Sequence, residues 1–469
     1  MGVFHCVVAS LMVCALPAVA ARPAIEYRTC SSELAAAGAR CGTLHVPEDH
    51  ARPRGRRIPL NVVVLPGTGP ASDAKLAQYD LEGGPGFAAT DFFGFYAGEG
   101  AIYRQTRDIV LVDMRGTGGS NPLRCAGIEE LERRQSAAAL YPAELVIECA
   151  QQSSVASDPR QYTTAAAARD IELVRQALGY EQLDLNAISY GTTLALQYIA
   201  DFPERVHSAV MMGTVPADRT PPRFHAPAAQ ASFERLADDC QADRACREQF
   251  GDLRKNLQAA LDRLGAAAVM PAPVFLEKLR NRLYAPAGRA VVPRLLWLAS
   301  QGDFREFGNT RGDGRVFADG LYLSITCAES FARMDVPAAI AVSRGTLFGA
   351  YRLERQAEAC RHWPIAAPSK SRTSAKPHTA KTNAATPMLF IAGELDPVSP
   401  ADWAQETAAR FPQSALVRVA RGAHVLDGLT DLDTCLDAVI LRFRDAGTAQ
   451  GLETACFARM RAPPFEGGE

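Results

Sequence analysis

Residues 183–192 read Leu-Asp-Leu-Asn-Ala-Ile-Ser-Tyr-Gly-Thr, and this stretch decides the fold. Its first six residues are mostly apolar and predict a buried strand, and residues 192–200 predict a helix. Ser189 therefore stands on a tight turn from a strand into a helix, between the small residues Ala187 and Gly191. A serine in this place has an exposed hydroxyl beside the positive end of a helix dipole, which stabilises developing negative charge. The context predicts a nucleophile, whereas most serines in short glycine-containing motifs lie on ordinary surface turns.

Alternating strands and helices extend on both sides of this turn. Apolar or β-branched runs predict further strands at residues 57–65, 79–82, 108–113, 206–212, 388–392 and 415–419. Apolar residues at helical spacing predict helices at residues 164–178, 402–411 and 432–444. Such alternation is typical of a mostly parallel sheet with helices on both faces, so the fold class is α/β.

The alternation is interrupted in the second half of the chain. Residues 216–365 begin with several prolines and then predict a mainly helical cap. Residues 366–387 are rich in Ser, Thr, Lys and Ala, which predicts a flexible linker. The predicted α/β core therefore consists of two parts, residues 21–215 and residues 388–469, with the cap inserted between them.

The amino terminus predicts export. Residues 7–20 are apolar and small, and their end, Ala18-Val19-Ala20, fits a signal-peptide cleavage site, so residues 1–20 are expected to be removed. The run is too short to span a bilayer, and no later segment is apolar enough to do so. We expect a periplasmic or secreted protein without a membrane span.

Cysteine usage agrees with export. Of the 12 cysteines, all but Cys6 and Cys14 follow the predicted signal, and an even number favours disulfides. The sequence does not fix the connectivity, so pairing of neighbours along the chain is a hypothesis. It pairs Cys30 with Cys41, Cys125 with Cys149, Cys240 with Cys246, Cys327 with Cys360, and Cys435 with Cys456. A metal site is the rival, but no Cys-x-x-Cys pair and no histidine at ligand spacing supports one.

Composition argues against a nucleic-acid partner. Hydrophobic residues make up 48% and charged residues 22%, as in globular proteins with a large core. The formal net charge of −2 gives no electrostatic footprint for nucleic acid.

A serine nucleophile needs a base and an acid. His424 follows the predicted strand at 415–419 and is the candidate base. Asp396 follows the predicted strand at 388–392 and is the candidate acid that orients the imidazole. The order Ser, Asp, His along the chain supports this choice. Glu394 is the competing acid, and Asp113, which precedes Ser189, is expected to organise its own turn.

Two backbone N–H groups are needed to stabilise an oxyanion. The residue after the nucleophile, Tyr190, is expected to supply one. Gly84, in the Gly-Gly-Pro-Gly loop of residues 83–86, is expected to supply the other, because glycines let a backbone approach a ligand closely. The alternative for this loop is a turn without a ligand.

Several ordered motifs resemble one family of enzymes. They lie at residues 82–86, 113–120, 188–192, 202–206, 393–398 and 422–424. The chain is similar in these motifs to exported serine peptidases of the α/β-hydrolase fold, the proline iminopeptidase and tripeptidyl aminopeptidase group. The closing pattern of Cys435 and Cys456 around a helix resembles the tripeptidyl aminopeptidase branch.

The resemblance implies cleavage at a free peptide N-terminus, without metal or organic cofactor. In such enzymes a helical cap covers the triad and its acidic residues hold the substrate ammonium, so Glu329 and Glu82 are candidate ligands. Two residues depart from the family pattern, namely Ala187 for the usual glycine and Glu82 where some members have histidine. An esterase with the same triad and a non-catalytic binding protein of the same fold remain the alternatives.

Overall fold

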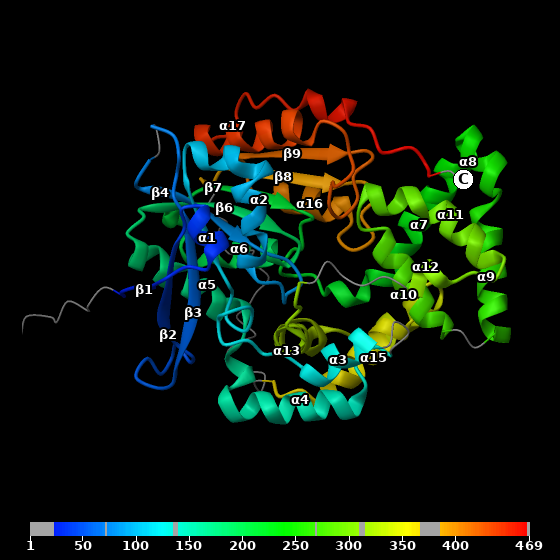
Figure 1. The fold of residues 1–469 in the computed structure, drawn as a ribbon, viewed down its shortest axis with the longest axis horizontal. Helices are drawn as coiled ribbons and strands as arrows, with labels where there is room; N and C mark the ends of the chain where they lie inside the picture. The colour runs from blue at the N-terminus through cyan, green and yellow to red at the C-terminus, as the bar shows by residue number, and fades with distance from the viewer. Residues whose placement is uncertain are drawn as a thin grey trace, which may run out of the picture.

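One large sheet organises the molecule (Figure 1). A computed structural model of the chain describes residues 23–70, 73–134, 139–267, 270–308, 315–365 and 385–466. In this part the strands form a nine-stranded sheet in the order β1-β2-β3-β5-β4-β6-β7-β8-β9. The strands are β1 Glu26–Arg28, β2 Arg40–Pro47, β3 Arg57–Leu65, β4 Leu76–Leu81, β5 Asp108–Val112, β6 Gln182–Ile188, β7 Val206–Met212, β8 Met388–Gly393 and β9 Ser414–Val419. The predicted signal peptide at 1–20 lies outside the described residues, as does residues 366–384 of the predicted linker.

The sheet is mostly parallel, which confirms the predicted class. The strands β1, β2, β3 and β5 pair antiparallel. All pairs from β5 through β4, β6, β7 and β8 to β9 are parallel. β4 is the point at which the strand order reverses, because β5 lies on one side of it and β6 on the other. Ligands of open α/β sheets bind outside the carboxyl ends of the strands at such a point.

Helices cover both faces of the sheet and build the cap. They are α1 Ser32–Ala36, α2 Phe93–Ala97, α3 Ala126–Arg134, α4 Ala143–Ala156, α5 Thr164–Leu178, α6 Tyr190–Asp201, α7 His225–Ala242, α8 Arg244–Phe250, α9 Leu253–Ala267, α10 Ala272–Arg282, α11 Pro286–Ser300, α12 Arg305–Gly308, α13 Asp319–Ile325, α14 Val336–Arg344, α15 Tyr351–His362, α16 Ala401–Ala408 and α17 Ala438–Ala446. No helix of the described residues is long and apolar enough to cross a membrane.

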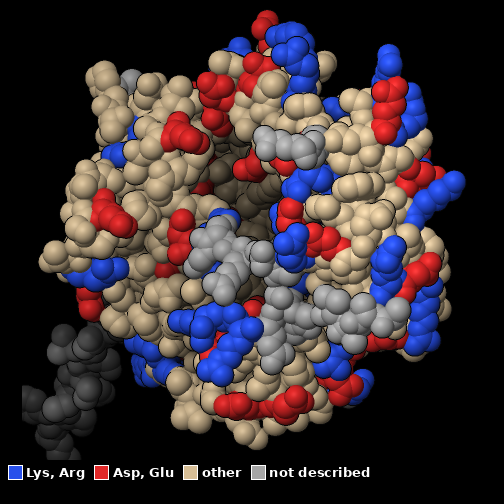
Figure 2. All heavy atoms as spheres, turned by 45° about the vertical axis from the view of Figure 1, so that its right-hand side comes forward, with Lys and Arg blue, Asp and Glu red and all other residues tan. Residues whose placement is uncertain are grey.

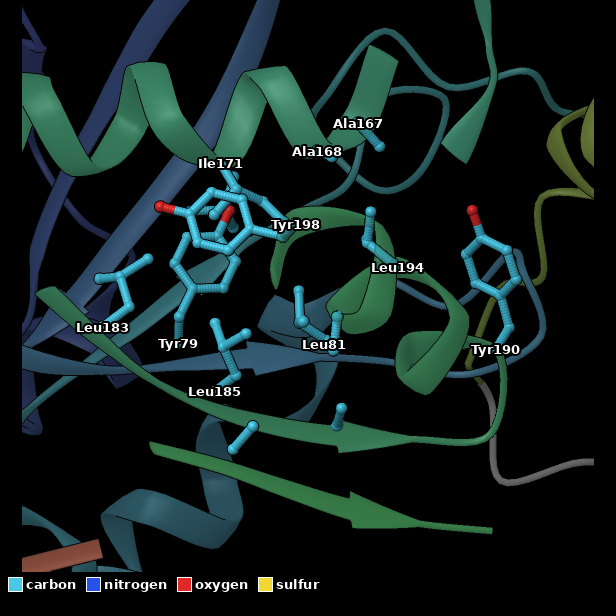
Figure 3. Packing of buried hydrophobic residues seen from close by; sticks show 14 of the residues in the cluster. Tyr79, Leu81, Ala167, Ala168, Ile171, Leu183, Leu185, Tyr190, Leu194 and Tyr198 are labelled. Atoms are coloured by element: carbon cyan, nitrogen blue, oxygen red, sulfur yellow. The ribbon is translucent and has the colours of Figure 1, made fainter. Parts of the chain in front are cut away.

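Successive side chains along the strands belong to two separate hydrophobic cores, one on each face of the sheet. In β3, Val62 and Val64 belong to one buried cluster, and Val63 and Leu65 belong to the cluster on the opposite face, because successive side chains of a strand point to opposite faces. The first cluster packs under α5, α6 and α16. Figure 3 shows how tyrosines fill it, with Tyr79 of the sheet beside the helices α5 and α6.

The helical part has cores of its own. One cluster, which we call the outer cap core, joins buried residues of α7 to α12 with Phe348. The C-terminal tail packs against it, since Phe465 contacts this cluster and the Glu466 N–H donates to the carbonyl of Ala290 at 3.1 Å. A second cluster joins α3 and α4 to α13 and α15, and these helices lie together in Figure 1. The boundary at residue 215 therefore remains a prediction, because α3 and α4 precede it and pack with helices that follow it.

Five disulfides in the described residues each lie within one buried cluster. They are Cys30–Cys41, Cys125–Cys149, Cys240–Cys246, Cys327–Cys360 and Cys435–Cys456. These are the pairs that the neighbour hypothesis predicts.

Candidate active site

Ser189 occupies a strained turn between β6 and α6. Its backbone has φ 56° and ψ −124°, a conformation that a non-glycine residue adopts only when the surrounding structure imposes it. The helix starts so close to β4 that a Cβ on Gly191 would lie 1.9 Å from the carbonyl oxygen of Leu81. Glycine is thus required at residue 191. Ala187 stands in place of the usual glycine. Its methyl group packs into the core between the sheet and α6, so the turn accommodates it.

Strand register places the glycine loop beside Ser189. Leu81 of β4 pairs with Ala187 of β6, so the residues two positions further on, Gly83 and Ser189, face each other. A Cβ on Gly83 would lie 3.0 Å from the Cβ of Ser189. The amide of Gly84, the next residue of this loop, is the candidate oxyanion donor that the sequence predicts.

The second candidate donor is the N–H of Tyr190. Tyr190 is the first residue of α6, and the first N–H groups of a helix have no partner within it. Figure 3 shows Tyr190 at the turn where β6 ends, at the edge of the cluster away from Tyr79 and Tyr198. Its hydroxyl is fixed by a 2.8 Å hydrogen bond with Thr164 at the start of α5.

His424 and Asp396 are in direct contact. His424 Nδ1 lies 2.8 Å from Asp396 Oδ2, and both residues are buried. The other carboxylate oxygen, Oδ1, accepts from the N–H groups of Val398 and Ser399 at 2.7 and 2.9 Å. Since Nδ1 faces the carboxylate, Nε2 is the nitrogen left to accept a proton from a nucleophile.

The hydroxyl of Ser399 is a contact that the sequence analysis missed. It donates to Asp396 Oδ2 at 2.7 Å and lies 3.2 Å from His424 Nδ1. A local signal was present, because an aspartate commonly accepts from the backbone two residues on, and such a turn brings Ser399 back to Asp396.

β7 brings the two halves of the site together. The Ser189 N–H donates to the carbonyl of Met212 at 2.9 Å. The next residue, Gly213, lies against the imidazole, since a Cβ there would be 3.1 Å from His424 Cε1. No described residue hydrogen-bonds to the Ser189 hydroxyl, so a bond to His424 would need side-chain rotation or a bound substrate.

The cap closes over this site. The ring of Tyr284 packs edge-on against His424, with 5.2 Å between ring centroids. The Val425 N–H donates to the carbonyl of Tyr284 at 3.0 Å. On the other side, Phe317 is so close to the glycine loop that a Cβ on Gly86 would lie 2.7 Å from its ring. In the space-filling view, one face carries a deep hollow with acidic and basic side chains around it (Figure 2).

The two candidate ammonium ligands differ in their surroundings. The Glu329 carboxylate accepts from Thr164 N at 2.8 Å and from Thr164 Oγ1 at 2.6 Å, so it caps α5. Burial, followed by the charge of Asp80, raises the pKa of Glu82 well above its usual value. A carboxyl that readily keeps its proton is a weaker ligand for an ammonium group, so Glu329 is the better candidate.

The alternative acids have other partners. Glu394 is exposed and forms an ion pair with Arg418 at 3.1 Å. Asp113 accepts from Thr90, Asn61 and the Gly119 N–H, so it holds its own turn. Among the described residues, no group of three or more His, Cys, Asp or Glu side chains is placed to hold a metal ion.

Known families match both parts of the core. A family described as alpha/beta hydrolase fold matches residues 82–277, and one described as TAP-like protein matches residues 345–456. The chain has the α/β-hydrolase fold. It is a serine hydrolase with a TAP-like C-terminal region.

Individual relatives of this hydrolase are distant but match most of its length. Tripeptidyl aminopeptidase from Streptomyces lividans is 25% identical over 485 residues, which cover 93% of this chain and 87% of the relative. Carboxylesterase B from Mycobacterium tuberculosis is 26% identical over 469 residues, which cover 89% and 86%. The crystal structure of proline iminopeptidase from Mycobacterium smegmatis superposes with a TM-score of 0.43 at 18% identity, covering 86% of this chain and 98% of that chain.

Proposed function

We propose that this hydrolase is an exported serine aminopeptidase that removes proline or a short di- or tripeptide from free peptide N-termini. Ser189 attacks the scissile carbonyl while His424 takes its proton, and Asp396 orients the imidazole. The N–H groups of Tyr190 and Gly84 stabilise the oxyanion. His424 then gives the proton to the leaving amine. In the second half of the reaction, His424 takes a proton from the water that attacks the acyl group and returns it to the Ser189 oxygen as the acid product leaves.

The buried contact between His424 and Asp396 carries this proposal. The imidazole of this contact lies beside Gly213, the residue that follows β7. The last carbonyl of β7, that of Met212, accepts from the Ser189 N–H. The match to the Streptomyces tripeptidyl aminopeptidase over 93% of the chain favours peptide substrates.

Export is part of the proposal. Two observations support it, namely the apolar amino-terminal segment and the five disulfides, which persist in oxidising compartments. The intact mass of the protein isolated from its native host should equal that of a chain that begins at residue 21.

Mass analysis of products tests the chemistry. The protein is incubated with matched peptides whose N-termini are free or acetylated. Release of N-terminal residues from the free peptides alone is expected, and the mass of the product gives the released length. Ser189→Ala should abolish release, whereas Ser154→Ala, which removes an exposed hydroxyl on α4, should not change it. Equal cleavage of acetylated peptides would contradict an aminopeptidase.

Glu329→Gln tests the ammonium ligand. If Glu329 holds the substrate ammonium, KM for free peptides rises by about tenfold or more, the effect of one charge-assisted hydrogen bond, and hydrolysis of an acetyl ester is unchanged. If it only caps α5, the melting temperature falls and KM does not change. The second result would return the role to Glu82 or to another group.

An esterase is the second candidate, because the similarity to carboxylesterase B covers 89% of the chain. Hydrolysis of esters without cleavage of any peptide would favour it.

A further inference from the structure

An unbalanced ion cluster lies in the cap next to the candidate active site. Glu277 of α10 accepts from Arg352 of α15 at 2.6 Å and from Arg280 at 3.2 Å. Arg280 is 3% exposed. Two guanidinium groups thus share one carboxylate, which leaves one positive charge in excess. The two arginines also hold the pKa of Glu277 below its usual value despite burial, so the carboxylate stays charged and the excess stays at one.

The cluster lines a cavity that contains unused polar atoms. The walls of this small cavity include Arg280, Arg352, His225 and Ser343. Ser343 is 1% exposed, and its hydroxyl has no hydrogen-bond partner in the described structure. The same is true of His225 Nδ1. Buried polar atoms are nearly always satisfied by protein, water or ligand, so unpartnered atoms on two different helices that face one cavity mark it as a place for a polar group.

The electrostatic environment of the cavity favours an anion. Burial is the main cause that lowers the pKa of His225 well below its usual value, and the positive charges of Arg280 and Arg352 lower it further. His225 is therefore neutral at neutral pH and can donate a hydrogen bond. A carboxylate could accept from the two arginines, the hydroxyl and the imidazole without leaving a buried charge unpaired.

One residue connects this cavity to the candidate catalytic histidine. Arg280 Nη1 donates to the hydroxyl of Tyr284 at 2.6 Å, and the ring of Tyr284 packs against His424. In the proposed mechanism His424 protonates the leaving amine. The leaving part of the substrate therefore lies on the side of the histidine, which is also the side of the cavity.

We propose that the cavity bounded by Arg280, Arg352, His225 and Ser343 is a subsite for a carboxylate of the leaving peptide. This inference rests on the proposed aminopeptidase function and specifies its substrate class: short peptides whose free C-terminal carboxylate, or an acidic side chain, reaches the subsite after the cleaved bond. The subsite would be separate from the groups that hold the substrate ammonium.

Matched peptides test the subsite. Alanine peptides with free N-termini, and with one to three residues after the cleaved bond, are compared as C-terminal acids, C-terminal amides, and amides that end in aspartate. We expect kcat/KM to favour at least one carboxylate form over the plain amide by about tenfold or more, the effect of a charge-assisted hydrogen bond. The acid and the aspartyl amide distinguish a C-terminal carboxylate from an acidic side chain. Equal rates for all three forms at every length would overturn the proposal.

Variants locate the preference. Arg352→Gln should reduce it to within about twofold, because it removes the excess charge and leaves Glu277 paired with Arg280, with little change in cleavage of the plain amide. Ser343→Ala, which breaks no ion pair, should reduce it partly. Arg344→Gln is the control, since it removes an equal charge from an exposed ion pair with Glu354 on the same helix as Ser343. A preference that persists in both cavity variants would contradict the assignment.

Binding separates the two proposals. Calorimetry on the Ser189→Ala protein gives the Kd of acid and amide peptides without turnover. Tighter binding of a carboxylate form, without peptide cleavage by the active protein, would contradict the aminopeptidase function and leave the subsite supported. Cleavage with neither a rate preference nor a binding preference would sink only the subsite.

Discussion

In the sheet, backbone register places the reactive groups, whereas in the cap, side-chain packing places the groups that surround them. Ser189 and Gly83 meet because β4 and β6 pair in register, and His424 reaches the site past the end of β7. Tyr284 and Arg280 reach it through a contact of two rings, one hydrogen bond between their side chains and one backbone hydrogen bond from Val425. The difference predicts that changes in the core alter the chemistry on every substrate and that changes in the cap alter the choice among substrates.

Removing the nucleophile should give the largest effect. Ser189→Ala and His424→Ala should each lower kcat by at least about 10⁴-fold on every substrate, because the triad acts as a unit. Cap variants such as Arg352→Gln should instead change the ratio between substrates. Steady-state kinetics on one ester and two peptides measure both. A cap variant whose activity fell equally on all substrates would contradict a separate role of the cap.

Two glycine variants compare the tolerance of the core and of the cap to an added methyl group, measured as stability. Gly191→Ala should lower the free energy of unfolding by about 2–4 kcal/mol, because its Cβ would collide with the backbone of β4. Gly265→Ala lies in α9 of the cap, where a Cβ meets nothing within 4 Å, and should raise stability by about 0.5–1 kcal/mol. Thermal unfolding measures both. Equal effects would show that the elbow is not closely packed.

The sequence predicted most of the core because its signals are local. Residues 57–65, 164–178 and 206–212 form elements with the expected bounds, since each is an apolar run or a helical period that ends at a clear breaker. It missed β2, whose eight residues mix arginine, glycine and histidine with apolar positions. It also missed that α4 packs with α15 of the cap, because that contact joins segments about 200 residues apart.

Ser399→Ala should have an intermediate effect. The variant removes one hydrogen bond to Asp396 and a polar contact to His424. We expect kcat to fall by about tenfold while KM and the melting temperature change little, as for the loss of one bond to a charged group. Ser399→Thr, which keeps the hydroxyl, should restore most of the rate. A rise in KM alone would contradict a role in orienting Asp396.

For the candidate site, the sequence predicted the nucleophile, acid and base, which follow strands, but missed Ser399 and the cap residues Tyr284 and Arg280. Ser189, Asp396 and His424 each follow a predicted strand, so chain order alone suggested their meeting. Tyr284 and Arg280 carry no comparable signal, because a tyrosine or arginine on a helix has many structural roles. Glu329 shows the same limit, since its contact with Thr164 depends on how the cap sits on α5.

A buried carboxyl in the cap should make stability depend on pH. Burial, followed by the charge of Glu132, raises the pKa of Asp319 to about 8. The folded state then binds more protons than the unfolded state between about pH 4 and 8, so this group lowers stability as pH rises, by at most about 1.4 kcal/mol per pH unit. Asp319→Asn should flatten the decline in melting temperature between pH 5 and 8. Parallel curves for the two proteins would contradict the raised pKa.

The central claim is that Ser189 is a nucleophile activated by His424, and covalent labelling tests it most directly. The protein is treated with a fluorophosphonate, which reacts with activated serines, and the label is counted and mapped by mass spectrometry. The account predicts one label per chain on Ser189, none in Ser189→Ala, and labelling at least about 100-fold slower in His424→Ala. Labelling of another serine, or equal rates with and without His424, would contradict it.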